Sequence, residues 1–267
     1  MLGFIVDNLD TALCLGIFRY LTKLQPQQQN ADIINKSMVI FAFSYGTIKY
    51  TRFFHPSKQL ESHIEAEWRS RIVGMVHAIV LIIGSILCFS EWPYRGDDAW
   101  VVKDPEVYYY PEIFASIFAG YLQYDFIWLI KNRKENFDLA TIIHHLLYIP
   151  ITHYVLWGRF FARPFAWLSV GELSTPFLHL RWFCIATDNK QSKLYSIYSN
   201  LFAITFLLTR VIGFGLGLVD LWLDRNIWLP LPVGLKFVIL GVHMGFGLNL
   251  FWAKKVTNAL FKHLKKD

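Results

Sequence analysis

The sequence is poor in charged residues. Only 17% of its residues are Asp, Glu, Lys or Arg, whereas soluble globular domains average about 25%. Hydrophobic residues make up 54% of the chain and aromatic residues 17%, a composition typical of proteins that contact lipid and its interface. This balance excludes a disordered chain, a collagen-like repeat and a coiled coil.

Cysteines and short catalytic signatures are also scarce. The three cysteines, Cys14, Cys88 and Cys184, lie far apart in apolar contexts, so they form no disulfide framework. The sequence has no HExxH, no GxSxG and no phosphate-binding loop, the signatures that would indicate zinc, serine-nucleophile or nucleotide chemistry. A metal site is therefore a weak alternative, and no cofactor is expected.

Long apolar runs take the place of these features. Each of seven runs approaches the roughly 20 residues that cross a bilayer. Their bounds are 37–54, 72–90, 111–130, 139–158, 160–186, 194–219 and 229–252. The run 160–186 contains Glu172 and Pro176, and it is predicted to be a broken span or a re-entrant segment. Because Pro176 cannot donate the usual helical hydrogen bond, we expect a kink there that exposes carbonyl groups near residue 172.

Basic residues are concentrated in alternate loops between these runs. By the positive-inside rule, those loops and the C-terminus lie in the cytosol and the N-terminus lies in the lumen. Six spans would break this alternation. We therefore expect an interfacial, lumenal segment at 1–36, the first span and its cytosolic loop at 37–64, a membrane domain at 65–253 and a basic cytosolic tail at 254–267.

Titratable side chains inside the apolar runs are the best indicators of function, because charge at membrane depth is costly. Residues three or four apart share a helix face, so Tyr121 aligns with Asp125. His144 or His145 lies on a polar stripe with Tyr148, and Glu172 lies on a second stripe. Such stripes predict an all-α, polytopic membrane bundle of about seven spans around a central polar cavity.

The predicted site follows from these stripes. We expect His144 or His145 to lie within hydrogen-bond or single-water reach of Asp125 or Glu172, facing a cavity open to the membrane. A neutral His beside a carboxylate can act as general base or nucleophile, so these four residues are the catalytic candidates. The substrate-binding candidates are His77, Tyr121, Tyr148, Ser174 and Arg210. Taken singly, His77, His153 and His243 are equally compatible with packing residues bonded to a carbonyl or hydroxyl group one turn away.

Several short segments occur in a characteristic order. They are Glu67-Trp68-Arg69-Ser70-Arg71 with His77, Gly120-Tyr121 with Asp125, His144-His145, Gly171-Glu172-Leu173-Ser174-Thr175-Pro176-Phe177 and Arg181-Trp182-Phe183. Together they resemble the TLC-domain family, which includes ceramide synthases, translocon-associated membrane proteins and a cargo receptor between endoplasmic reticulum and Golgi. The resemblance covers roughly residues 65–252 and is closest to the branch called TLC domain-containing protein 4.

The resemblance implies a helical membrane bundle around a lipid-accessible cavity, located in the endoplasmic reticulum or connected endomembranes. In ceramide synthases, a His pair and a later His-Asp with a further Asp are associated with N-acylation by acyl-CoA. His144 and His145 match the pair, whereas Gly171, Glu172 and Thr175 stand where the later His and the two Asp are expected. One His and one carboxylate are therefore missing, and the homeobox-like segment of some ceramide synthases is absent.

Three functions remain open from the sequence. The first is a protein that binds or processes lipids and contributes to lipid homeostasis. The second is an acyltransferase that uses acyl-CoA as co-substrate and a sphingoid base or other lipid amine, as in ceramide and sphingolipid synthesis. The third is a non-enzymatic receptor or chaperone for membrane proteins. Membrane lipids are the expected partners, self-association stays open, and nucleic acid is not expected because the basic residues sit at span ends.

The charge pattern makes a prediction about topology. A tag on the C-terminus should be digested by protease added to sealed microsomes, and a tag on the N-terminus should be protected, because the basic loops and tail stay in the cytosol. Detergent-opened microsomes, in which both tags should be digested, are the control. A protected C-terminal tag would contradict the seven-span arrangement.

Overall fold

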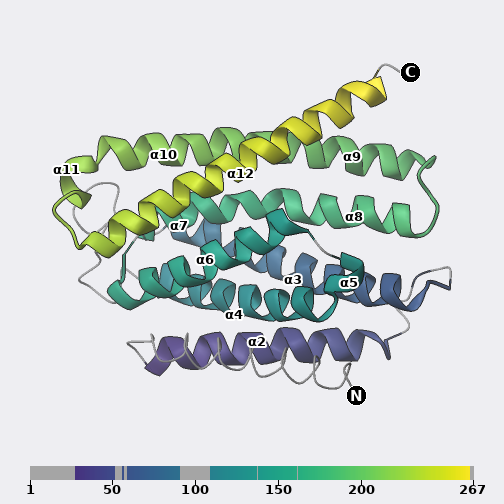
Figure 1. The fold of residues 1–267 in the computed structure, drawn as a ribbon, viewed down its shortest axis with the longest axis horizontal. Coiled ribbons are helices and arrows are strands. Elements are labelled where there is room, and N and C mark those ends of the chain that lie inside the picture. Colours follow the sequence, from purple (N-terminus) through teal and green to yellow (C-terminus); the bar gives the residue numbers. More distant parts are fainter. Residues whose placement is uncertain are drawn as a thin grey trace.

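The computed structural model describes residues 28–51, 56, 59–90, 109–136, 138–160 and 162–264. These residues are almost entirely helical (Figure 1). The longer helices are α2 (Gln28–Ile48), α3 (Ser62–Ser90), α4 (Tyr109–Lys131), α6 (Leu139–Gly158), α8 (Thr175–Ala186), α9 (Lys193–Phe206), α10 (Phe214–Leu223) and α12 (Val233–Leu264). Shorter segments join or interrupt them, namely α5 (Arg133–Asn136), α7 (Ala162–Ser169), η3 (Val170–Ser174), η4 (Leu207–Gly213) and α11 (Arg225–Trp228).

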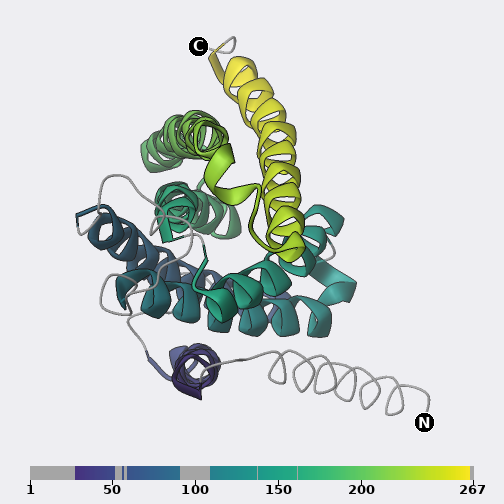
Figure 2. The ribbon, with the colours of Figure 1, turned by 90° about the vertical axis from the view of Figure 1, so that its left-hand side faces the viewer.

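The helices form a bundle whose members run side by side along the longest axis of the molecule (Figure 1). Viewed end on, α2 lies at one edge (Figure 2), and α12 runs obliquely to α9 and α10 (Figure 1). Among the described residues, five helices are long and apolar enough to cross a membrane. The chain is therefore an all-α, multi-pass membrane protein, as its sequence predicts.

These five helices correspond to five of the predicted spans. They cover Ser62–Phe89, Tyr109–Lys131, Leu139–Gly158, Lys193–Leu223 and Val233–Ala259. The predicted first and fifth spans are also helical, but α2 is more polar, and the fifth is divided into α7, η3 and α8. A count of seven spans thus stays a prediction.

Two helices begin earlier than the apolar runs that predict them. The first helix begins at Gln28 rather than residue 37, because Asn30 and Ile34 in its polar first half are buried. The second begins at Ser62 rather than residue 72, and it includes two basic residues that were assigned to the preceding loop. Arg71 is held there by an ion pair of 2.6 Å with Glu67, one helical turn earlier. Residues 1–27 of the predicted interfacial segment lie outside the described residues.

The helix that carries the His pair has well-defined ends. Asp138 caps the N-terminus of α6, where its carboxylate accepts hydrogen bonds from Ala140 N at 3.3 Å and from Thr141 Oγ1 at 2.5 Å. Such a cap satisfies backbone donors that the first turn leaves unpaired. At the other end, Arg159 adopts a left-handed backbone conformation with φ of 49° and ends the helix. The caps fix the first and last residues of α6 and so the positions of His144 and His145 along it.

A close approach between α2 and α4 depends on Gly120. A Cβ atom at this position would lie 2.6 Å from the carbonyl oxygen of Ile34 and 2.8 Å from Ser37 Cβ. Because a main-chain oxygen of a packed helix cannot move aside easily, only glycine fits here. The contact holds α2 against the outside of the helix that carries Tyr121 and Asp125.

We therefore predict that Gly120→Ala destabilises the protein by about 1–3 kcal/mol, the usual cost of overpacking. Gly46→Ala on α2 is the matched control, because no atom lies within 4 Å of a Cβ atom there, and alanine favours the helix by about 0.5–1 kcal/mol. The measurement is the thermal unfolding midpoint of each variant in detergent. Equal midpoints for the two variants would show that the α2–α4 contact is not close.

Candidate functional site

The fifth predicted span is interrupted where the sequence indicates. Between α7 and α8 the chain forms the 3₁₀ segment η3, and Pro176 follows as one of the first residues of α8. The interruption frees main-chain carbonyl groups from helical pairing, and the carbonyl oxygen of Gly171 accepts a hydrogen bond of 3.1 Å from Arg210 Nε. The predicted break near residue 172 is thus confirmed, with the distortion beginning before the proline.

A second irregularity faces the first. The long helix that runs from α9 to α10 contains the π-helical segment η4, Leu207–Gly213, and Arg210 lies at its centre. π-Helical turns are rare and often occur at functional sites. The widened turn directs a charged side chain out of an apolar helix toward η3. No sequence pattern predicted the π segment; the lone arginine in an apolar run was its only signal.

Arg210 and Glu172 form an ion pair between these two segments. Arg210 Nη2 donates to Glu172 Oε1 at 3.1 Å, and both side chains are largely buried. Thr175 Oγ1 donates to Glu172 Oε2 at 2.8 Å. Arg210 Nε also donates to Ser174 Oγ at 3.1 Å. Each buried charge therefore has several partners, as a charge inside a membrane requires.

A contact that the sequence predicts joins the His pair to a carboxylate. His145 Nε2 lies 3.0 Å from Asp125 Oδ2, and His145 Nδ1 lies 2.9 Å from the carbonyl oxygen of Thr141. Since a carbonyl oxygen can only accept, His145 Nδ1 donates to Thr141, and Nε2 is left to contact Asp125. The contact expected between the His pair and Asp125 or Glu172 is present.

The two histidines have different environments. His145 is buried in its contact with Asp125, whereas the neighbouring His144 lines an internal cavity. The ring of His144 contacts aromatic rings, with centroid distances of 4.7 Å to Tyr148 and 6.1 Å to Trp252. Successive helical residues point about 100° apart, so α6 can direct His145 to Asp125 and His144 to the cavity.

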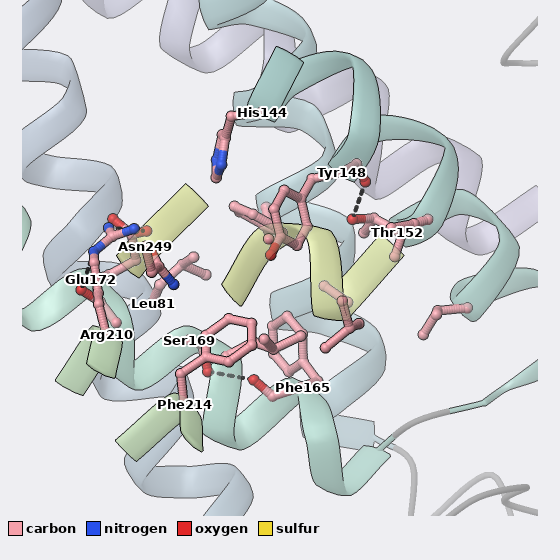
Figure 3. A pocket seen from close by; sticks show the side chains of 18 residues that line it. Leu81, His144, Tyr148, Thr152, Phe165, Ser169, Glu172, Arg210, Phe214 and Asn249 are labelled. Atoms are coloured by element: carbon pink, nitrogen blue, oxygen red, sulfur yellow. Dashed lines mark hydrogen bonds and ion pairs between the residues drawn. The ribbon is translucent and has the colours of Figure 1, made fainter. Parts of the chain in front are cut away.

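The cavity has a volume of about 60 Å³, which is room for a few water molecules or a short part of an alkyl chain. Figure 3 shows His144, Tyr148 and Thr152 on one side of it, with Glu172, Arg210 and Asn249 on another. Much of the remaining wall is apolar and includes Leu81, Phe165, Leu168, Phe214 and Val242. The cavity thus combines a mainly hydrocarbon-like wall with a few polar groups, a pattern typical of small-molecule sites.

Three of the predicted binding residues do not line this cavity. Ser174 is buried behind it and hydrogen-bonds Arg210. His77 and Tyr121 stack on each other with a centroid distance of 3.6 Å, and they pack against Phe41 of α2. His77 therefore does not line the cavity, because its ring is turned toward α2 and α4.

Two other histidines are packing residues. His153 Nδ1 and His243 Nδ1 lie 2.8 Å and 2.7 Å from the carbonyl oxygens of Ile149 and Ile239, each one turn earlier. Their Nε2 atoms contact Gln123 Nε2 at 3.0 Å and Trp222 Nε1 at 2.9 Å. Each histidine thus contacts one carbonyl oxygen of its own helix and one side chain of another helix, as expected for a packing residue.

Asn249 is a cavity residue that the sequence did not indicate. Its side chain is buried on α12 and lines the cavity beside Glu172 and Arg210 (Figure 3). Asn249 is not ionisable and so does not stand out by charge, although an isolated Asn in an apolar span also indicates a polar contact. Among the described residues, no group of three or more His, Cys, Asp or Glu side chains is placed to hold a metal ion.

The fold and these residues define a membrane-embedded helical protein of the TLC-domain class. The family model described as TLC domain matches residues 67–258, and the chain belongs to this family.

Several relatives are TLC domain-containing proteins 4. The chain is 26% identical to TLC domain-containing protein 4 A of Dictyostelium discoideum, over 81% of this chain and 83% of that protein. It is 27% identical to TLC domain-containing protein 4-A of Xenopus laevis, over 87% and 92%, and 26% identical to the human TLC domain-containing protein 4, over 75% and 78%. No solved structure matches the chain.

The ion pair makes a prediction about stability. Glu172→Gln or Arg210→Gln alone leaves a buried charge without its partner, and we expect each to cost about 3–5 kcal/mol. The double variant should cost clearly less than the sum, because it removes both charges. Thermal unfolding in detergent measures this, with Arg225→Gln, at an exposed position, as the control. Additive losses would show that the two side chains do not interact.

Proposed function

We propose that this protein binds a membrane lipid inside its helical bundle and contributes to lipid homeostasis in the endoplasmic reticulum or connected endomembranes. The observation that carries the proposal is the central cavity, whose mainly apolar wall includes one patch of polar groups around Arg210. An amphiphile has the same division between a hydrocarbon part and a polar part. The proposal includes an N-terminus in the lumen and a C-terminus in the cytosol.

Arg210 is the residue best suited to bind the polar part of the lipid. Its hydrogen bonds to other described residues use Nε and Nη2, so Nη1 remains available for an ester, hydroxyl or phosphate oxygen. The ion pair with Glu172 keeps the guanidinium in place before a ligand arrives, which reduces the ordering cost of binding. Asn249 adds a neutral amide that both donates and accepts.

A second candidate function is the N-acylation of a lipid amine by acyl-CoA. It is favoured by His144, which lines the cavity next to the His145–Asp125 contact. In this reaction the amine nitrogen attacks the thioester carbonyl, and His144 takes the amine proton. As the bond between carbon and sulfur breaks, His144 gives this proton to the sulfur, and coenzyme A leaves as the thiol. The His145–Asp125 contact would position His144 through α6, the helix that carries both histidines. The receptor alternative has less support, because the His145–Asp125 contact lies inside the bundle.

The test is the lipid composition of cells that lack the protein, after variants are reintroduced. We expect wild type and Leu240→Phe to restore the composition and Val242→Phe to fail, because Val242 lines the cavity whereas Leu240 is exposed on the same helix. Equal membrane abundance of the two variants is the control for folding. Full restoration by Val242→Phe, or no change of lipid composition on removing the protein, would contradict the proposal.

The variant His144→Ala separates the two functions in the same cells. If the protein only binds lipid, His144→Ala should restore the lipid composition nearly as well as wild type. If it is an acyltransferase, general acid–base catalysis worth about 10²–10⁴-fold is lost, and the acylated product should not reappear.

A further inference from the structure

A second cavity lies between α8, α9 and α12, apart from the central one. Its volume is about 240 Å³, larger than that of the central cavity. Its polar wall is formed by Arg181, Tyr195, Ser199, Asn200 and Lys255. No residue is shared between the walls of the two cavities.

The polar wall carries two positive charges. Arg181 Nη2 donates to Tyr195 Oη at 3.2 Å, and its Cζ atom lies 5.4 Å from the centroid of the same ring. Lys255 Nζ lies 4.4 Å from the centroid of the Phe251 ring. Within the described part of the chain, neither cation forms an ion pair with a carboxylate. The cavity therefore has positive charge that no carboxylate of the described residues neutralises.

Unused hydrogen-bonding groups lie beside these cations. Ser199 Oγ is buried and has no hydrogen-bond partner among the described residues, although Ser199 lines the cavity. A buried hydroxyl without a partner is unfavourable, so its place in the wall is explained if a ligand accepts its hydrogen bond. Asn200 adds an amide. A guanidinium, an ammonium, two hydroxyl groups and an amide converging on one space are the groups that bind phosphate oxygens.

The apolar part of the wall indicates an amphiphile. Phe202, Ala203, Val256 and Ala259 complete the lining. The cavity is near the end of α8, which stops at Ala186, and beside the C-terminal half of α12, which passes α9 (Figure 1). Both regions belong to the basic, predicted cytosolic side of the membrane. Basic pockets between helices at that surface suit anionic lipid head groups.

We propose that this second cavity binds the phosphate group of an amphiphilic ligand at the cytosolic surface of the membrane. Arg181 and Lys255 neutralise the phosphate, Ser199 donates to it, and the apolar wall receives the adjoining hydrocarbon. The phosphate belongs either to an anionic phospholipid or to a soluble phosphate ester such as coenzyme A. The proposal does not depend on lipid binding in the central cavity.

The test uses the full chain in nanodiscs of neutral phosphatidylcholine, with or without added phosphatidic acid. Native mass spectrometry counts the phosphatidic acid retained by wild type, by Arg181→Gln/Lys255→Gln and by Ser199→Ala. Hydrogen bonds to charged groups contribute enough that we expect about tenfold weaker retention by the double variant. Ser199→Ala should lose less.

Lys254→Gln is the matched control, because Lys254 is exposed on the same helix next to Lys255 but does not line the cavity. It should retain phosphatidic acid like wild type. Equal retention by the double variant, or an equal loss by Lys254→Gln, would overturn the lipid head group as the source of the phosphate and indicate non-specific attraction to surface charge. If the double variant does not fold, Lys255→Gln and Ser199→Ala test the same point.

A second arm identifies the source of the phosphate. Coenzyme A is titrated against wild type in neutral nanodiscs, and its binding is measured by equilibrium dialysis. Binding that the double variant loses supports a soluble phosphate ester. Retention of phosphatidic acid without binding of coenzyme A supports a lipid head group. Binding of neither ligand would overturn the proposal. Val242→Phe, which changes only the central cavity, should bind both ligands like wild type, because the two cavities share no residue.

Discussion

The ion pair between Glu172 and Arg210 is the contact on which the arrangement of the bundle depends. Neither charge can be hydrated by lipid, so each must be neutralised within the protein. Glu172 and Arg210 are 38 residues apart in the chain, so the segments that carry them must pack side by side. Regular helices would not bring the two side chains together with the hydrogen bonds observed. The 3₁₀ segment on one side and the π segment on the other adjust the backbone so that the guanidinium reaches the carboxylate, a serine and a main-chain carbonyl group.

The same requirement explains the central cavity. Glu172 and Arg210 pair with each other and form a polar part of the cavity wall within an otherwise apolar interior. The polar part of a lipid can be bound at this wall while its hydrocarbon part stays in apolar surroundings. His145 is committed to Asp125, while His144 stays at the cavity surface. In the acyltransferase alternative His144 would thus be the base, and His145 would position it. The second, basic cavity follows a different principle, since Arg181 and Lys255 both line it and neither is paired with a carboxylate of the described residues.

The sequence predicted the parts of the structure that depend on local composition. Apolar runs located the helices, and α6 has the predicted bounds because its ends are capped by neighbouring residues. Asp125 and Arg210 were indicated because charge in an apolar run needs a partner. Other features depend on contacts between distant segments and left no local pattern. The early start of α2 depends on burial of Ile34 beside Gly120, the choice of His145 over His144 depends on which face of α6 meets α4, and the stacking of His77 on Tyr121 depends on α2. Arg181 and Lys255 were attributed to topology, since their common cavity is a tertiary feature.

A structure of the protein in lipid nanodiscs, determined at a resolution that shows bound lipid, tests the central claim most directly. The claim is that buried polar pairs maintain a lipid-binding cavity inside the bundle. The expected result is elongated density in the central cavity, with its polar end in hydrogen-bond range of Arg210 or Asn249, and with the Glu172–Arg210 and His145–Asp125 contacts intact. A cavity that is closed by side chains, with Glu172 turned toward the surrounding lipid, would contradict it.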